Sequence, residues 1–141
     1  MQDDETIIQQ ILYKLDGWKL EDDIEDDVLI EAEYNKLISS DEVLHFYNTA
    51  YNYALAFTKL STFPTITKTI IVDEEEIETT EIEPITFTAL ILWSAGLLWR
   101  KYNIRSNDQI DESYTIGYGD SLIIQAKEML KGYKDYRFYA Y

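Results

Sequence analysis

The sequence predicts a mainly α-helical protein, a small bundle of about five helices with a short β-hairpin or extended arm and an extended C-terminal tail. Apolar residues recur at helical spacing over most of the chain. One β-branched run interrupts this pattern, and five aromatic residues crowd into the last ten positions. A length of 141 residues leaves room for one domain with its own core, so residues 1–141 are expected to form a single helical domain.

The N-terminal part, residues 1–38, is predicted to contain two helices. Residues 4–16 carry one apolar stripe, formed by Ile7, Ile8, Ile11, Leu12 and Leu15. The acidic residues at positions 3–5 suit the positive end of that helix, and Gly17 is expected to end it. Residues 21–38 are predicted to form the second helix, with one apolar face made of Ile24, Val28, Ala32 and Leu37.

The third helix is predicted over residues 39–60. Ser39 and Glu42 have the spacing of a capping box, which marks a helix start. The apolar positions then repeat in alternating steps of three and four, through Val43, Tyr47, Ala50, Ala54 and Phe57.

Residues 65–72 break the helical pattern. Seven of these eight residues are β-branched, so they are predicted to form a strand. The following acidic segment, 73–83, retains some strand character. The two segments, 65–83 together, are therefore expected to form a hairpin or an arm that reaches out of the domain.

Pro84 is predicted to start the fourth helix, which runs from residue 85 to about 104 and is apolar on nearly all sides. This helix is expected to be central, with Gly96 allowing another helix to approach closely. Residues 106–119 are predicted to be a polar loop with a short extended stretch at 114–116 and a turn at Gly117 and Gly119. Asp120 or Ser121 would then start a fifth helix that ends near residue 131, followed by the aromatic tail at 132–141.

The charge is uneven along the chain. Residues 1–83 hold 21 acidic and 5 basic side chains, whereas residues 84–141 hold 6 and 7, which together give the net charge of −15. Such an acidic protein is not expected to bind nucleic acid by neutralising phosphates. No apolar stretch reaches the roughly 20 residues of a membrane span, and no secretory signal peptide is visible, so no membrane association is expected.

Little of the sequence favours catalysis. The chain has no cysteine and a single histidine, His45, with no nucleophile motif nearby. The acidic runs at 22–27 and 73–76 lack the glycine and spacing of a calcium loop, and residues 116–119 lack the frame of a phosphate loop. We therefore expect no enzyme activity, no catalytic residue, no cofactor and no metal site, although paired carboxylates remain an alternative.

Surfaces for partners are expected instead in the arm and the tail. Twelve tyrosines exceed what a core of this size needs, and a loose aromatic tail would expose a large apolar surface. The predicted interface residues are Ile70, Val72, Ile77, Ile82, Tyr133, Tyr136, Phe138, Tyr139 and Tyr141. The predicted acidic face, toward a channel or solvent, consists of Asp22, Asp23, Asp26, Asp27, Glu74, Glu75 and Glu76.

Residues 39–134 resemble the head-tail connector proteins of tailed phages, also called head-completion or adaptor proteins. The likeness lies in the order of segments: a helix that opens Ser-Asp-Glu-Val-Leu at 40–44, and a proline-started apolar helix that ends Trp-Arg-Lys-Tyr at 99–102. Tyr-Thr-Ile-Gly-Tyr-Gly-Asp-Ser at 114–121, Ala-Lys-Glu-Met-Leu at 126–130 and Tyr133 complete it. Residues 1–38 and 73–83 are outside the resemblance.

The resemblance implies a structural virion protein, made in the host cytoplasm and located at the neck between head and tail. It implies a homo-oligomeric ring, a dodecamer in the usual case, that binds the portal protein and a downstream neck or tail protein. Double-stranded DNA would pass through this ring without specific binding during ejection. The alternative that charge favours is an acidic DNA mimic, or another protein-binding module.

Overall fold

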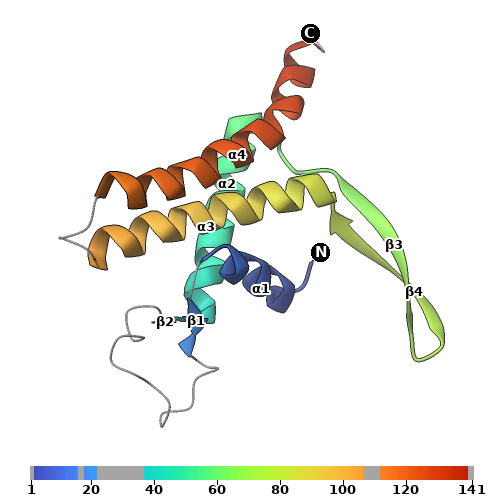
Figure 1. The fold of residues 1–141 in the computed structure, drawn as a ribbon. Helices are drawn as coiled ribbons and strands as arrows, with labels where there is room; N and C mark the ends of the chain where they lie inside the picture. Colours follow the sequence, from blue (N-terminus) through green and yellow to red (C-terminus); the bar gives the residue numbers. More distant parts are fainter. Residues whose placement is uncertain (1, 16–17, 22–36, 107–111, 140–141) are drawn as a thin grey trace.

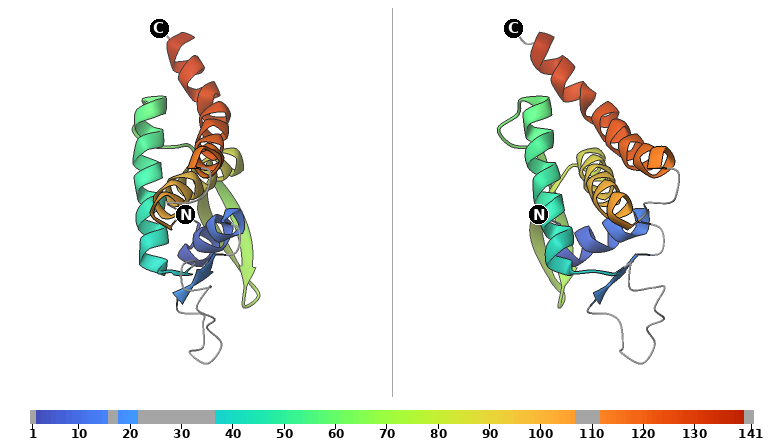
Figure 2. Two further views of the ribbon diagram at one scale, coloured as in Figure 1. Left: turned by 60° about the vertical axis from the view of Figure 1, so that its left-hand side comes forward. Right: turned by 90° about the vertical axis from the view of Figure 1, so that its left-hand side faces the viewer.

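The computed structural model describes residues 2–15, 18–21, 37–106 and 112–139, and their side chains outside 102–106, 112–116 and 134–139. Within these ranges the chain is mainly helical, with four helices and two short strand pairs (Figure 1). Three helices pack around α3, and one antiparallel hairpin extends away from them (Figure 2).

Helix α1, Asp4–Lys14, confirms the first predicted helix and its apolar stripe. Asp3 is the N-cap, and its carboxylate accepts a hydrogen bond from the Thr6 N–H at 2.7 Å. Hydrogen bonds from the backbone, and then from the side chain, of Thr6 lower the pKa of Asp3. Ile7, Ile8 and Ile11 are buried against α2 and α3.

Two short strands flank the acidic segment 22–36. Strand β1, Lys19–Leu20, pairs in parallel with β2, Leu37–Ile38. The predicted helix over 21–38 is therefore wrong at its C-terminal end, where Ile38 is a buried strand residue. Residues 22–36 of that predicted helix lie outside the described residues.

Helix α2, Ser40–Thr58, confirms the third predicted helix. Ser39 is its N-cap and accepts a hydrogen bond from the Glu42 N–H at 3.2 Å. The buried side of the helix consists of Val43, Tyr47, Ala50, Ala54 and Thr58. Burial, and then the neighbouring Tyr51, raise the pKa of Tyr47 to about 12.

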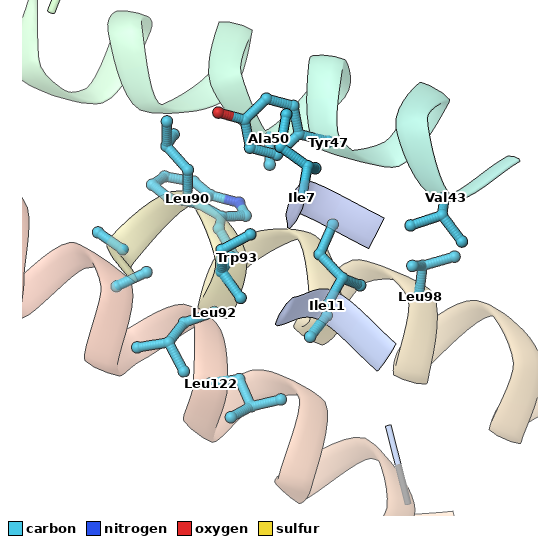
Figure 3. Packing of buried hydrophobic residues seen from close by; sticks show 14 of the residues in the cluster. Ile7, Ile11, Val43, Tyr47, Ala50, Leu90, Leu92, Trp93, Leu98 and Leu122 are labelled. Carbon is cyan, nitrogen blue, oxygen red and sulfur yellow. The ribbon is translucent and has the colours of Figure 1, made fainter. Parts of the chain in front are cut away.

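Helix α3, Pro84–Ser106, begins at the predicted proline and is the central element. It contacts α1, α2 and α4, and most of its residues from Ala89 to Leu98 are buried. Side chains from all four helices meet in one core, in which Leu90, Trp93 and Leu98 of α3 lie between the other helices (Figure 3). A helix that packs on three neighbours is apolar on nearly all sides, as the sequence indicated.

Helix α4, Glu112–Tyr139, differs most from the sequence prediction. The predicted polar loop, with its extended stretch at 114–116, is helical from Glu112 onward, and neither Asp120 nor Ser121 caps a helix. The backbone continues as helix past Gly132 to Tyr139, so the tail is not extended over that range. Asp120 instead pairs with Arg100 of α3 at 3.4 Å.

Two glycines explain this difference. Gly96 of α3 and Gly119 of α4 face each other where the helices cross, and a Cβ on Gly96 would lie 2.7 Å from the Gly119 carbonyl oxygen. Gly119 therefore permits close helix packing and makes no turn, which confirms the expected close approach at Gly96. Tertiary contacts at this crossing outweigh the cost of placing glycine in a helix, which is about 1 kcal/mol relative to alanine.

Candidate assembly surface

The β-hairpin is the most exposed ordered element of the described chain. Strand β3, Thr65–Val72, pairs antiparallel with β4, Glu75–Ile82, from Thr65–Ile82 at the base to Val72–Glu75 at the turn. This confirms the predicted strand and the hairpin alternative for 65–83. The hairpin projects from the helical body (Figures 1 and 2), and most of its residues are exposed.

A two-residue turn closes the hairpin without glycine. Asp73 and Glu74 both have positive φ angles, 52° and 66°. Positive φ at both central positions is the requirement of a type I′ turn, for which Asn-Gly is the preferred sequence. The turn therefore holds two acidic residues in a left-handed conformation at the outer end of the hairpin.

Aliphatic side chains lie on both faces near this turn. Because directly opposed residues share a face, Ile70 and Ile77 lie together on one side with Val72. Ile71 lies on the other side and is 74% exposed. Of the predicted interface residues, Ile70, Val72 and Ile77 are thus at the surface. Ile71 belongs with them but was not predicted, although strict strand alternation would have placed it on the opposite face.

The base of the hairpin is anchored to the helical body. Ile82, which was predicted at the interface, is instead a core residue with 3% exposure. The side-chain amide of Gln2 makes two hydrogen bonds to the backbone of Ile82: it donates to the Ile82 carbonyl at 3.0 Å and accepts from the Ile82 N–H at 3.4 Å. Phe63, which precedes the hairpin, is buried against Tyr51 and Tyr133.

The two strands carry opposite charge. Strand β3 has one basic residue, Lys68, and no acid, whereas β4 has four glutamates, Glu75, Glu76, Glu78 and Glu81, and no base. Lys68 pairs with Glu81 across the hairpin at 3.2 Å. One edge of the hairpin is therefore strongly acidic and the other is not.

An open groove of about 680 Å³ lies beside the hairpin base. Its lining is mostly apolar and comprises Leu60, Thr62, Pro64, Glu83, Ile85, Met129, Gly132 and Tyr133. The Tyr133 hydroxyl donates to the Glu83 carboxylate at 2.8 Å and accepts from the Thr86 hydroxyl at 2.9 Å. Burial is the main cause that raises the pKa of Tyr133. Tyr133 thus belongs to the surface of its own domain.

The remaining predicted residues divide between the turn and the undescribed parts. Glu74, Glu75 and Glu76 are exposed at the hairpin turn. Asp22, Asp23, Asp26, Asp27 and Tyr141 lie outside the described residues. Tyr136, Phe138 and Tyr139 belong to the α4 backbone, but their side chains are not described.

The described ranges contain no cluster of side chains that could hold a metal ion. His45 is exposed on α2, where its ring contacts Phe46 edge-on. In the described part of the chain no three His, Cys, Asp or Glu side chains gather where they could hold a metal ion. Among the described helices, none has the length and apolar character needed to cross a membrane.

Comparisons with protein-family models, with curated proteins and with solved structures found no match to this chain.

Proposed function

We propose that this protein is a structural subunit that assembles with copies of itself into a ring at the head-tail junction of a tailed phage. It would extend the DNA channel below the portal protein and offer a platform to the next neck or tail protein. The protein would act through binding and without catalysis.

One observation carries the proposal: an ordered hairpin with exposed Ile70, Ile71, Val72 and Ile77 projects from a helical body to which its base is anchored at Ile82. An isolated two-stranded hairpin is at best marginally stable in water. Burying its aliphatic residues against a partner contributes favourable free energy that the lone subunit lacks.

The presence of two different surfaces, the hairpin and the groove on the helical body, also supports a ring. A closed ring needs two different patches on each subunit, which meet head to tail. The hairpin provides a projecting patch with two unlike edges, and the groove beside Ile85 and Met129 provides an apolar hollow on the body. The order of helices that resembles connector proteins corresponds to α2, α3 and α4.

The negative charge suits a passage for DNA. Glu74, Glu75 and Glu76 are exposed at the hairpin turn, and residues 22–27 hold five further carboxylates. Acidic side chains that face a channel repel phosphates, so that duplex DNA slides without adhering. Reversing the charge of Asp22, Asp23, Asp26 and Asp27 together should slow DNA ejection under this proposal.

Mass measurement tests the proposal directly. Native mass spectrometry and electron microscopy of the purified protein, alone and mixed with the portal protein of the same virion, should reveal a ring with a central channel. Twelve copies of the 16.6-kDa chain have a mass of about 199 kDa. A protein that stays monomeric in both samples, and is monomeric in its native particle, would overturn the proposal. Strong inhibition of a DNA-binding enzyme by that monomer would favour a DNA mimic instead.

A further inference from the structure

The two outer edges of the hairpin present backbone groups to the surroundings. Within the described ranges, β3 and β4 pair only with each other, so each has one side without a strand neighbour. Exposed edges of this kind are templates for pairing with another chain, and proteins protect them with charge, proline or cover. The hairpin contains no proline, and most of its residues are exposed in the described structure.

The register specifies which backbone groups point outward. In an antiparallel pair closed by a two-residue turn, the residues that flank the turn, Val72 and Glu75, form a hydrogen-bonded pair. Alternate pairs along the ladder then direct their N–H and C=O groups outward. The outward residues are Thr65, Thr67, Thr69 and Ile71 on β3, and Glu76, Glu78, Thr80 and Ile82 on β4.

Gln2 provides an independent check of this alternation. Its side chain amide bonds to both the N–H and the C=O of Ile82, as a residue of a neighbouring strand would. The outer edge of β4 is therefore closed at Ile82 by the chain itself. Glu76, Glu78 and Thr80 remain as the part of this edge that a further strand can reach.

Charge discriminates among the ways in which two hairpins can pair. Two β4 edges would bring four glutamates of one strand against four of the other, and opposed like charges are destabilising. A β4 edge beside a β3 edge instead places glutamates next to threonine, isoleucine and Lys68. The acidic edge thus complements the edge that has no acid.

The pairing within one hairpin can repeat between hairpins. If β4 of one copy pairs with β3 of the next in the same register as the two strands inside each hairpin, Glu78 opposes Thr69 and Ile77 lies beside Ile70 of the neighbour. Each Lys68 would then lie between two Glu81 carboxylates, its own at 3.2 Å and that of the next copy. Each Ile70 would likewise be flanked by two Ile77 side chains, which reduces the exposure of both.

We infer that the partner of the hairpin is the hairpin of a second copy, with the β4 edge of one subunit paired antiparallel to the β3 edge of the next. This inference rests on the proposed ring and specifies its interface. The contact is heterologous, because each subunit uses one edge to each side, so successive copies form a continuous sheet that closes when the ring closes.

Two proline variants test the pairing. Thr69→Pro removes an outward N–H from the β3 edge, and Glu78→Pro removes one from the β4 edge, while both leave the hydrogen bonds inside the hairpin in place. Each variant alone should remain monomeric at concentrations where the unmodified protein forms rings. Mixed in equal amounts, the two should form a dimer of about 33 kDa that grows no further, because one intact edge of each kind remains.

Controls separate this result from misfolding. Thr69→Val and Glu78→Thr keep the backbone N–H and should still form rings, and thermal unfolding should show that both proline variants keep the helical body. A second variant without proline, Thr67→Glu with Thr69→Glu, places acid on the β3 edge. It should raise the concentration needed for half-assembly by about tenfold at low salt, and by less at high salt.

The outcomes distinguish the inference from the proposed function. If both proline variants form rings like the unmodified protein, the hairpin pairing is wrong and the ring proposal stands. If the unmodified protein forms only a dimer, and only the Thr69→Pro variant fails to form it, two β3 edges pair with each other. The inference is wrong in that case as well. If the unmodified protein forms no ring by itself or with the portal protein, both ideas are wrong.

Discussion

The helical body and the hairpin use the same residue types for opposite purposes. Ile11 in α1 is completely buried in the helical core, whereas Ile71 in β3 is 74% exposed. The body is closed on itself, with helices that approach within van der Waals contact at Gly96 and Gly119. The hairpin has two strands, two faces and little cover. Apolar side chains therefore stabilise the subunit in one region and are available for a partner in the other.

The boundary between the two regions is sharp. Ile82, Phe63 and the Gln2 contact fix the base of the hairpin to the core, and from Ile66 outward the strands depend on their own pairing. The regions can consequently be tested separately, because a change in the outer hairpin leaves the core packing untouched.

The largest expected difference in the free energy of unfolding comes from replacing one isoleucine by alanine, once in the helical body and once in the hairpin. Ile11→Ala removes a fully buried side chain and should lower the free energy of unfolding by about 2–5 kcal/mol. Ile71→Ala removes an exposed one and should change it by less than about 0.5 kcal/mol. Chemical denaturation of the monomer measures both values. A loss at Ile71 as large as that at Ile11 would mean that the hairpin belongs to the folding core.

Substituting alanine at two glycines, Gly96 and Gly117, should change the stability by a smaller amount and in opposite directions. This comparison tests how tightly the helical body is packed. The added methyl group of Gly96→Ala would overlap the Gly119 carbonyl and Ile123, and such overpacking costs about 1–3 kcal/mol. At Gly117 nothing lies within 4 Å of the added methyl group, so Gly117→Ala should stabilise α4 by about 0.5–1 kcal/mol. Thermal unfolding of the two variants should therefore shift in opposite directions. Equal shifts would contradict the close crossing of α3 and α4.

The smallest expected effect is a loss of stability of the helical body at alkaline pH, caused by the buried Tyr47. The pKa of Tyr47 is about 12 in the folded protein, against about 10 for an unfolded chain. Between these values the unfolded chain releases a proton that the folded protein retains. The free energy of unfolding should therefore fall by about 1.4 kcal/mol per pH unit from pH 10 toward 12, and be unaffected by this group below pH 10.

Tyr47→Phe should remove that part of the alkaline loss, whereas Tyr13→Phe, at a residue that is 84% exposed, should leave it unchanged. Denaturation curves at several alkaline pH values provide the measurement. The contribution of Tyr47 would be refuted if the wild type and Tyr47→Phe lost stability in parallel. The hairpin, residues 65–82, contains no tyrosine and should be indifferent to this titration.

Local patterns in the sequence predicted most elements of both regions. The apolar stripe of α1, the Ser39 cap of α2, the β-branched run of β3 and the start of α3 at Pro84 all act over a few residues, and each is present in the structure. The surface residues Ile70, Val72 and Ile77 were predicted from the same local signals. Prediction succeeded where the physical cause lies within one element.

Prediction failed where the cause lies between elements. Gly117 and Gly119 were interpreted as turn residues and the last helix was expected to end near residue 131, yet α4 continues through both glycines and past Gly132. For Gly119 the compensating contact is Gly96, more than 20 positions away. Ile82 was predicted at the interface because it belongs to the arm at 65–83, but its position at the hairpin base places it in the core. The groove at Ile85 and Met129 joins segments distant in the chain and had no local signal.

The contact between Gln2 and Ile82 also bears on how the protein is made. The two residues are 80 positions apart, and α1 packs on α3, which follows Ile82. At about 5–20 residues per second, a ribosome needs about 4–16 seconds to extend the chain from one residue to the other. During that interval Ile7, Ile8 and Ile11 have no completed partner surface. The nascent chain therefore exposes an apolar stripe that a chaperone can recognise until α3 emerges.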